Sequence, residues 1–435
     1  MQSSFNWRSA CTLLLAGSVL CLPHLLLSQS SGAAQISGTI FDQTSAVVPN
    51  AQVKMIQDNT GQVKSTASSA NGAYMLSNLP VGPYTLDVTA SGFRHYIQKG
   101  IVLAVGDQVQ LPVALTLGAV TQEVEVSAEA NMVQTQETSI SNLVDQQRII
   151  DLPLNGRAAT QLILLSGGAA SSPAFSFGGG GPAIVTTKTY TSSVAISVAG
   201  QQATGNDFLL DGGDNIDAFS NTNLPYPFPD ALQEFSVQTS GLSAQYGVHP
   251  GAAVNVVTKA GTNQFHGDLF EFLRNGVFNG RNYFATAQDT LHRNQFGGVV
   301  GGPVILPHIY NGRGKLFGFF GYQNTIQRTA PPSTISFVPT QAMLNGDFSA
   351  RESGACQSSG KPLTITDPNT GNAFSASQVS PTRFSAQALA LLKYIPLSTD
   401  PLGCGKMTYG IPTPSNETQY IGRVDWPTSE KRLSP

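Results

Sequence analysis

The tightest constraint on the fold is the spacing of apolar residues along the chain. In segments such as YTLDVT (84–89) they occupy every second position, and turns rich in Gly, Pro and Asn separate these segments. A period of two places one face of a strand in a core and the other in solvent. Short strands divided by such turns predict a mainly β chain.

Composition agrees with this prediction. Only 11% of the 435 residues are charged. Glycine is abundant, with 44 residues. This length corresponds to two to four domains. The net charge of −3 gives no reason to expect nucleic acid as a partner or a polybasic membrane surface.

The N-terminus, residues 1–34, has the pattern of a signal peptide. Arg8 precedes the apolar run ACTLLLAGSVLCL (10–22), and small residues follow in SQSSGAA (28–34). A transmembrane anchor is the alternative, but Pro23 and His24 interrupt the run and leave it short for a span. The bulky Leu20 before Cys21 is wrong for a lipoprotein signal.

Residues 35–118 carry a series of short motifs. They are GTIFD (38–42), PNAQV (49–53), GAY (72–74), LPVGPYTL (79–86) and GF (92–93). Their order resembles the carboxypeptidase regulatory-like domain. The resemblance implies a transthyretin/Ig-like β-sandwich and makes carbohydrate binding conceivable. It does not imply peptidase activity, because no His in the sequence has Glu three positions later.

Residues 119–262 carry a second resemblance. IIDLPLNGR (149–157), the segment at 196–217 and the segment at 231–267 follow the order found in Oar-like TonB-dependent receptors. The resemblance implies an α+β plug domain. The matching structural positions are Asn206, Leu210, Asp211, Gly212, Tyr246, Gly247, Asn255, Thr258 and Lys259.

The segment VTQEVEVSA (120–128) resembles the TonB box, through which an energising partner of the TonB type would pull. Its central residues are Gln122, Glu123, Val124, Glu125 and Val126. Pairing by β-augmentation uses backbone groups, so it places few demands on the side chains. An ordinary strand linking two domains remains the alternative.

Residues 263–435 are expected to form the first strands of an incomplete transmembrane β-barrel in outer-membrane lipid. The candidate strands are 265–275, 294–305, 315–325 and 418–426, with a turn at 307–315. Receptors of this class have about 22 strands, so we expect the N-terminal, truncated portion of a longer receptor. Residues 326–418 resemble an extracellular loop without a convincing strand.

Two cysteines, Cys356 and Cys404, lie in that loop-like region. Exported bacterial proteins fold in an oxidising compartment, which favours a disulfide between them. Two free thiols are the alternative.

The acidic segment NDFLLDGGDNID (206–217) is the sharpest candidate for chemistry. Its acids are spaced by four, three and three residues, and it has no Glu, unlike a calcium-binding EF-hand loop. Nothing else in the sequence supports paired-carboxylate hydrolysis. We therefore interpret it as a turn. The sequence predicts no catalytic residue, no metal site and no cofactor, and so no enzyme.

Together these patterns predict an exported, Oar-like TonB-dependent receptor of the cell outer membrane that takes part in substrate uptake. Its partners would be a TonB-type protein and an unknown external ligand. The alternative is an exported, non-transporting protein whose sandwich binds carbohydrate or peptide.

Overall fold

The computed structural model describes residues 33–118, 123–127, 139–172, 195–218, 221–242, 246, 249–281, 288–329, 334–410 and 413–427. The predicted signal peptide lies almost entirely outside them. The chain divides into two compact units. The first comprises residues 1–268, 298–322 and 419–435, and the second comprises 269–297 and 323–418. The expectation of a mainly β chain is confirmed.

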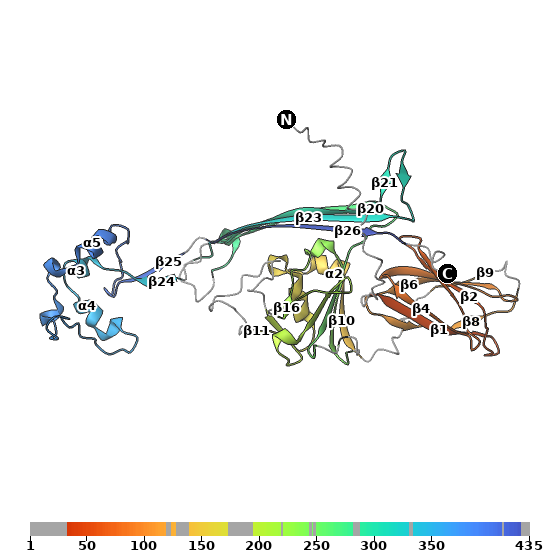
Figure 1. Cartoon of the computed structure of the whole chain (residues 1–435), viewed down its shortest axis with the longest axis horizontal. Coiled ribbons are helices and arrows are strands. Elements are labelled where there is room, and N and C mark those ends of the chain that lie inside the picture. Colours follow the sequence, from red (N-terminus) through yellow and green to blue (C-terminus); the bar gives the residue numbers. More distant parts are fainter. Residues whose placement is uncertain are drawn as a thin grey trace, which may run out of the picture. The chain divides into compact units, whose positions relative to one another are not determined.

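The N-terminal part forms two sheets, which we call the sandwich (Figure 1). The first has the order β4-β1-β7, and β8 also pairs with β1. Its strands are β1 Ala34–Asp42, β4 Ala73–Leu79, β7 Gln108–Gln110 and β8 Val113–Leu115. The second has the order β3-β2-β5-β6-β9. Its strands are β2 Gln52–Gln57, β3 Val63–Ala67, β5 Gly82–Thr89, β6 His95–Leu103 and β9 Glu123–Ser127.

One apolar core lies between these sheets. Ile36 and Ile40 of β1 are fully buried together with Met55 of β2 and Leu86 of β5. On β5 the buried residues alternate with partly exposed ones, which is the pattern expected from YTLDVT. Burial of such side chains is worth about 1.5–3 kcal/mol each, so this core stabilises the sandwich.

The described residues between 139 and 262 form what we call the central domain. Its main sheet has the order β10-β17-β18-β13-β14. The strands are β10 Ile140–Asp145, β13 Asp207–Leu210, β14 Gly213–Asp214, β17 Leu232–Ser240 and β18 Ala253–Thr258. All residues of β18 are buried, so apolar and polar side chains alike face protein on both sides of this strand.

The segment at 141–157 begins within strand β10 and continues as helix α2, Gln146–Asp151. The carboxylate of Asp145 caps the helix by accepting a hydrogen bond from the Arg148 amide at 2.9 Å. The helix ends before Pro153, which restricts the preceding residue to an extended conformation. Two short pairs complete the domain, β11 Ala169–Ser172 with β12 Ala195–Val198, and β15 Ile216–Asp217 with β16 Thr222–Asn223.

Four longer strands form another sheet, in the order β19-β20-β23-β26. We call them the wall strands. They are β19 His266–Asn275, β20 His292–Pro303, β23 Phe317–Thr329 and β26 Thr413–Asp425, and a small hairpin of β21 Ile305–Leu306 and β22 Tyr310–Asn311 lies between β20 and β23. The boundary between the two compact units cuts across each wall strand.

The wall strands expose large apolar side chains. In the first unit these include Val300, Phe320, Tyr420 and Val424. In the second unit Leu269 is 92% exposed and Leu273 is 68% exposed. Apolar residues at alternate positions on the outer face are typical of strands that contact lipid.

The second unit contains most of the segment expected to be a strandless loop. That expectation was wrong in one respect, because β24 Thr334–Phe337 pairs with β25 Lys406–Tyr409. Short helices lie between them, α3 Gln341–Leu344, α4 Ser349–Glu352 and α5 Ala386–Leu392. A disulfide joins Cys356 to Cys404, and the Arg383 guanidinium donates two hydrogen bonds of 2.8 Å to the Asp367 carboxylate. Among the described residues no helix combines the length and apolar character needed to cross a membrane.

Asn206 joins three segments of the central domain. Its amide nitrogen donates to the carbonyl of Ile196 at 2.7 Å, and its amide oxygen accepts from the Ala252 amide at 3.1 Å. A Cβ atom at Gly251 would lie 2.5 Å from that amide oxygen. Only glycine therefore allows this close approach.

Replacing Gly251 with Ala is expected to destabilise the chain by about 1–3 kcal/mol, because Asn206 and the backbone of Gly205 must move to admit the methyl group. Urea unfolding of the full chain in detergent measures the change. Gly167→Ala is the matched control, since a Cβ atom there meets nothing within 4 Å. Equal stability of the two variants would contradict the packing account.

Candidate functional site

The acidic segment at 206–217 forms a tight hairpin. Strand β13 turns into β14 with Leu210 opposite Gly213, which leaves Asp211 and Gly212 as a two-residue loop. Both have positive φ, 50° at Asp211 and 80° at Gly212. An Asp-Gly pair is favoured in such a loop because both residues tolerate this conformation. The interpretation of this segment as a turn is confirmed.

A parallel pairing brings together the two segments of the central domain, 196–217 and 231–267, that carry the family resemblance. Strands β13 and β18 pair in parallel from Asp207 opposite Ala253 to Leu210 opposite Val256. The Asp211 amide then donates to the Val256 carbonyl at 2.9 Å. Residues more than forty positions apart in the sequence therefore meet at one end of this sheet.

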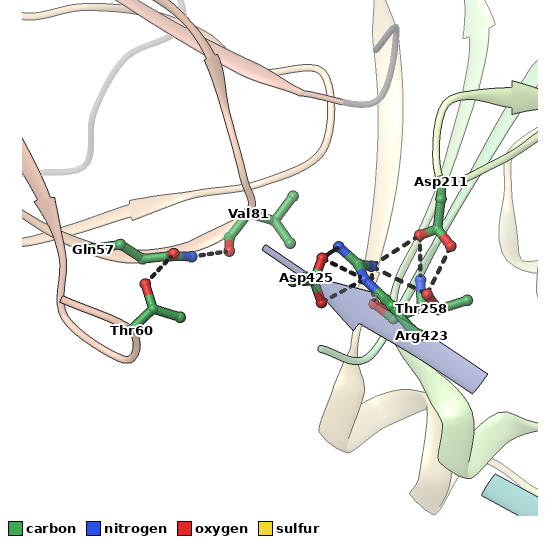
Figure 2. Close-up of polar contacts among 7 residues, drawn as sticks. All are labelled: Gln57, Thr60, Val81, Asp211, Thr258, Arg423 and Asp425. Atoms are coloured by element: carbon green, nitrogen blue, oxygen red, sulfur yellow. Dashed lines mark hydrogen bonds and ion pairs between the residues drawn. The ribbon is translucent and has the colours of Figure 1, made fainter. Parts of the chain in front are cut away.

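The Asp211 carboxylate binds the two hydrogen-bond donors of Thr258. It accepts from the Thr258 amide at 2.9 Å and from the hydroxyl at 2.7 Å. The Arg423 guanidinium, from wall strand β26, donates to the same carboxylate at 3.2 Å and to the Thr258 carbonyl at 3.0 Å. Figure 2 shows the guanidinium between Asp211 and Asp425, whose carboxylate oxygens lie 3.0 Å from the Arg423 Nε atom.

We call Asp211, Thr258, Arg423 and Asp425 the Arg423 network. Side chains of Asp211 and Arg423 are 38% and 28% exposed. A partly exposed ion pair contributes only about 0–1 kcal/mol, and each neutral hydrogen bond contributes about 1 kcal/mol. The network therefore holds these four side chains in one arrangement but contributes little free energy. Its rearrangement would cost only a few kcal/mol.

A second contact joins the central domain to β26. The Gln419 amide donates to the Tyr226 carbonyl at 3.0 Å and accepts from the Phe228 amide at 3.0 Å. The Phe228 ring is fully buried, and a Cβ atom at Gly321 of β23 would lie 2.9 Å from it. Two hydrogen bonds between the Gln419 side chain and backbone groups, together with the Phe228 ring, thus hold the central domain against these two wall strands.

A small cavity of about 280 Å³ lies beside the Arg423 network. Asp211, Thr258, Arg423 and Asp425 line one part, and the sandwich residues Gln57, Thr60 and Val81 line another (Figure 2). The Gln57 amide donates to the Val81 carbonyl at 3.2 Å and accepts from the Thr60 hydroxyl at 2.7 Å. Gln57 and Thr60 therefore each already use one donor within the sandwich.

The remaining positions matched to the plug pattern are also mainly buried. The Asn255 amide donates to the Tyr246 hydroxyl at 3.4 Å, while Leu210 packs against the domain core. The Lys259 side chain is 4% exposed, and burial lowers the pKa of its ammonium group. Gly247 lies outside the described residues. These residues hold the domain together and present no arrangement of acid, base and nucleophile.

The segment that resembles a TonB box lies elsewhere. Glu123, Val124, Glu125 and Val126 belong to β9, which pairs with β6 of the sandwich and not with the sheet that contains Asp211 and Thr258. Gln122 lies outside the described residues. The structure therefore does not bring this segment and the plug pattern into one site.

Glu234 links the sandwich to the central domain and was not singled out from the sequence. Its carboxylate accepts a hydrogen bond of 2.8 Å from the Val105 amide in the sandwich, and the residue is 8% exposed. Burial, with smaller contributions from the nearby Asp107 and Asp145, raises the pKa of the Glu234 carboxyl to about 7, although the hydrogen bond from Val105 lowers it.

Arg423 and Asp230 were also missed. Arg423 stands as a lone cation within the alternating segment TQYIGRVDW, and that position was the available signal. Asp230 forms a buried ion pair with Arg157, a residue of the LNGR pattern. Only the folded structure shows which residue pairs with Arg423 and which with Asp230.

Within the described ranges, no group of three or more His, Cys, Asp or Glu side chains could hold a metal ion.

Comparison with known proteins agrees with this architecture. Residues 257–433 match the outer membrane beta barrel domain, and residues 35–116 match the carboxypeptidase regulatory-like domain. The TonB-dependent transporter Oar of Myxococcus xanthus is 25% identical over 312 residues, which are 69% of this chain and 28% of Oar. The chain is similar to this transporter and spans 28% of its length. The match to the barrel domain and the similarity to this relative indicate an outer-membrane location.

Two solved structures that match the chain resemble it only remotely. The ferric enterobactin receptor of Pseudomonas aeruginosa has a TM-score of 0.31 and 18% identity, over 45% of this chain and 25% of the receptor. The catechol 1,2-dioxygenase of Acinetobacter radioresistens has a TM-score of 0.17 and 13% identity, over 24% of this chain and 57% of that enzyme. Both values are too low to bear on function. The curated relative is a transporter and not an enzyme.

A double-mutant cycle tests the Arg423 network. Asp211→Asn and Arg423→Gln are each expected to lower the free energy of unfolding by about 1 kcal/mol. Their coupling energy should be about 0.5–1 kcal/mol, because the pair is partly exposed. Urea unfolding of the two single variants and the double variant gives the coupling. A coupling of zero would mean that the ion pair contributes nothing to stability.

Glu234 makes the stability depend on pH. Its carboxyl pKa is raised from 4.5 to about 7 in the folded chain, so folding favours the protonated form. Its contribution is fully present below pH 4.5 and is lost as the pH rises through about 7. Unfolding measured from pH 4.5 to pH 8 should show this loss. Glu234→Gln stays neutral and keeps an acceptor for Val105, so it should flatten the profile, and an unchanged slope would exclude Glu234 as its source.

Proposed function

We propose that the chain is the N-terminal part of an outer-membrane TonB-dependent receptor that takes part in substrate uptake. In this proposal the sandwich comes first, residues 119–262 are the plug, and the wall strands begin the transmembrane barrel. The observation that carries the proposal is the Arg423 network, in which a wall strand holds the end of the central sheet.

The strength of these contacts suits a plug that must move. The Arg423 network and the two hydrogen bonds of Gln419 are polar and few. Each contributes about 1 kcal/mol and can be replaced by water when the domain shifts. A large apolar interface would resist such a shift much more strongly, because each fully buried large side chain costs about 1.5–3 kcal/mol to expose.

Energy would reach the plug through the segment that resembles a TonB box. It precedes the central domain directly in the sequence, so a pull on residues 122–126 is transmitted along the chain toward β10. The segment is an extended strand, which is the conformation that β-augmentation by a partner requires. An external ligand would bind on the opposite side of the plug.

The alternative function, carbohydrate or peptide binding by the sandwich alone, has less support. The cavity at the sandwich rim, at about 280 Å³, falls just below the range of about 300–1,000 Å³ typical of ligand pockets. Gln57 and Thr60, two of its polar residues, are hydrogen-bonded to each other. These two residues therefore have less hydrogen-bonding capacity left for a sugar.

Binding of a TonB-type C-terminal domain tests the receptor proposal. The full chain in detergent should bind that domain in calorimetric titration. Val124→Pro should weaken binding about tenfold or more, because proline removes a backbone donor from the strand. Val124→Ala is the matched control and should bind within about twofold of the unmodified chain, since backbone groups carry the interaction. Equal binding by the Pro and Ala variants would remove the TonB-box assignment.

A further inference from the structure

Residues 123–127 are the last strand of the sandwich's second sheet. β9 pairs in parallel with β6, from His95 opposite Glu123 to Lys99 opposite Ser127. The other neighbour of β6 is β5, so β9 occupies the edge position in the order β3-β2-β5-β6-β9. The segment that resembles a TonB box is therefore an integral strand of the sandwich.

This pairing satisfies an edge that would otherwise be open. β6 pairs with β5 on one side, from Leu103 opposite Gly82 to Tyr96 opposite Val88. On its other side, residues 95–99 pair with β9. An edge strand without a partner presents a row of free backbone N–H and C=O groups, to which an extended segment can add. The edge of β6 is thus a built binding site for a strand, and the chain itself provides the occupant.

Backbone contacts just before β6 fasten the chain shortly before β9. The Arg94 amide donates to the Thr116 carbonyl at 2.9 Å, and the Gly118 amide donates to the Gly92 carbonyl at 3.2 Å. These bonds fix residues 116–118 beside the start of β6. A short connection of this kind raises the effective concentration of the segment 123–127 at the β6 edge.

We propose that the β6 edge binds residues 123–127 in competition with the energising partner, so that the partner captures the segment only after β9 leaves β6. This inference rests on the proposed function, since it takes the segment to be the one that a TonB-type domain pairs with. The sandwich then has a defined role. It shields the segment, and the occupancy of β6 sets how much of the segment is available.

Two physical arguments favour displacement over addition to the outer edge of β9. The pairing with β6 covers only residues 95–99 and is parallel, and parallel pairing is slightly less stable per residue than antiparallel pairing. A strand of the partner can therefore replace it. In addition, a pull on a strand that is still bonded to β6 would transmit its force to the sandwich. A pull on a released strand would transmit its force to the central domain that follows it.

A reversible disulfide tests the proposal in the full chain. Ile97 and Glu125 face each other in the register of β6 and β9. Adjacent strands lie about 4.8 Å apart, which is within the Cα separation that a disulfide spans. The variant Ile97→Cys/Glu125→Cys can therefore be locked by oxidation and released by reduction. Lys54→Cys/Ser65→Cys, which face each other in β2 and β3, is the matched control and also corrects for reduction of the native disulfide.

The expected result is that oxidation of the 97–125 pair weakens binding of a TonB-type C-terminal domain at least about tenfold. Reduction should restore binding, and the control pair should bind equally in both states. If the oxidised 97–125 pair binds as tightly as the reduced pair, the competition is overturned while the proposed function stands. If no form of the chain binds the domain, both the partner assignment and the competition fail.

Amide hydrogen exchange tests the pairing of residues 123–127 with β6 without the TonB-type domain. Residues 123–127 should exchange more slowly in the free chain than in a synthetic peptide of residues 119–130, because part of their N–H groups is bonded to β6. Exchange at the rate of the peptide would overturn the inference even if the TonB-type domain binds the chain.

Discussion

The parallel pairing of β13 with β18 is the interaction on which the rest of the central domain depends. The pairing places Asp211 beside Thr258 and Asn206 beside Ala252. The hydrogen bonds of Asp211 and those of Asn206 therefore both depend on this one register. A shift of one residue would turn every side chain to the other face and would separate Asp211 from Arg423. The positive φ of Asp211 also contributes to this contact, because the tight turn keeps the Asp211 carboxylate next to Thr258, the last residue of β18.

Many polar groups of this domain are buried, and several of them are hydrogen-bonded within it. All residues of β18 are buried, including Asn255 and Thr258. A strand enclosed on both faces normally carries an unbroken apolar run. Here backbone and side-chain hydrogen bonds replace part of that apolar contact, and a domain held in this way loses less free energy when water enters than one held by apolar packing alone.

The sequence predicted the broad class of the fold and many of its strands, because alternation and turn residues are local signals. The Asp-Gly turn at 211–212 and the strands of the sandwich follow from such signals. The pairing of β24 with β25 could not be predicted, since it joins residues about seventy positions apart. For the same reason the sequence indicated Asp211 and Thr258 but not Arg423, whose role depends on which strand approaches the turn.

The edge of β6 shows why a strand pattern alone cannot assign a function. VTQEVEVSA reads as a strand whether it is a linker, a sheet edge or a segment for a partner, because backbone pairing tolerates most side chains. The structure pairs it with β6, and this pairing does not exclude use by a partner. The pairing covers the edge of β6 and one edge of the segment, and an exposed edge promotes aggregation. A short parallel pairing therefore reduces the exposed edge and still allows release of the segment.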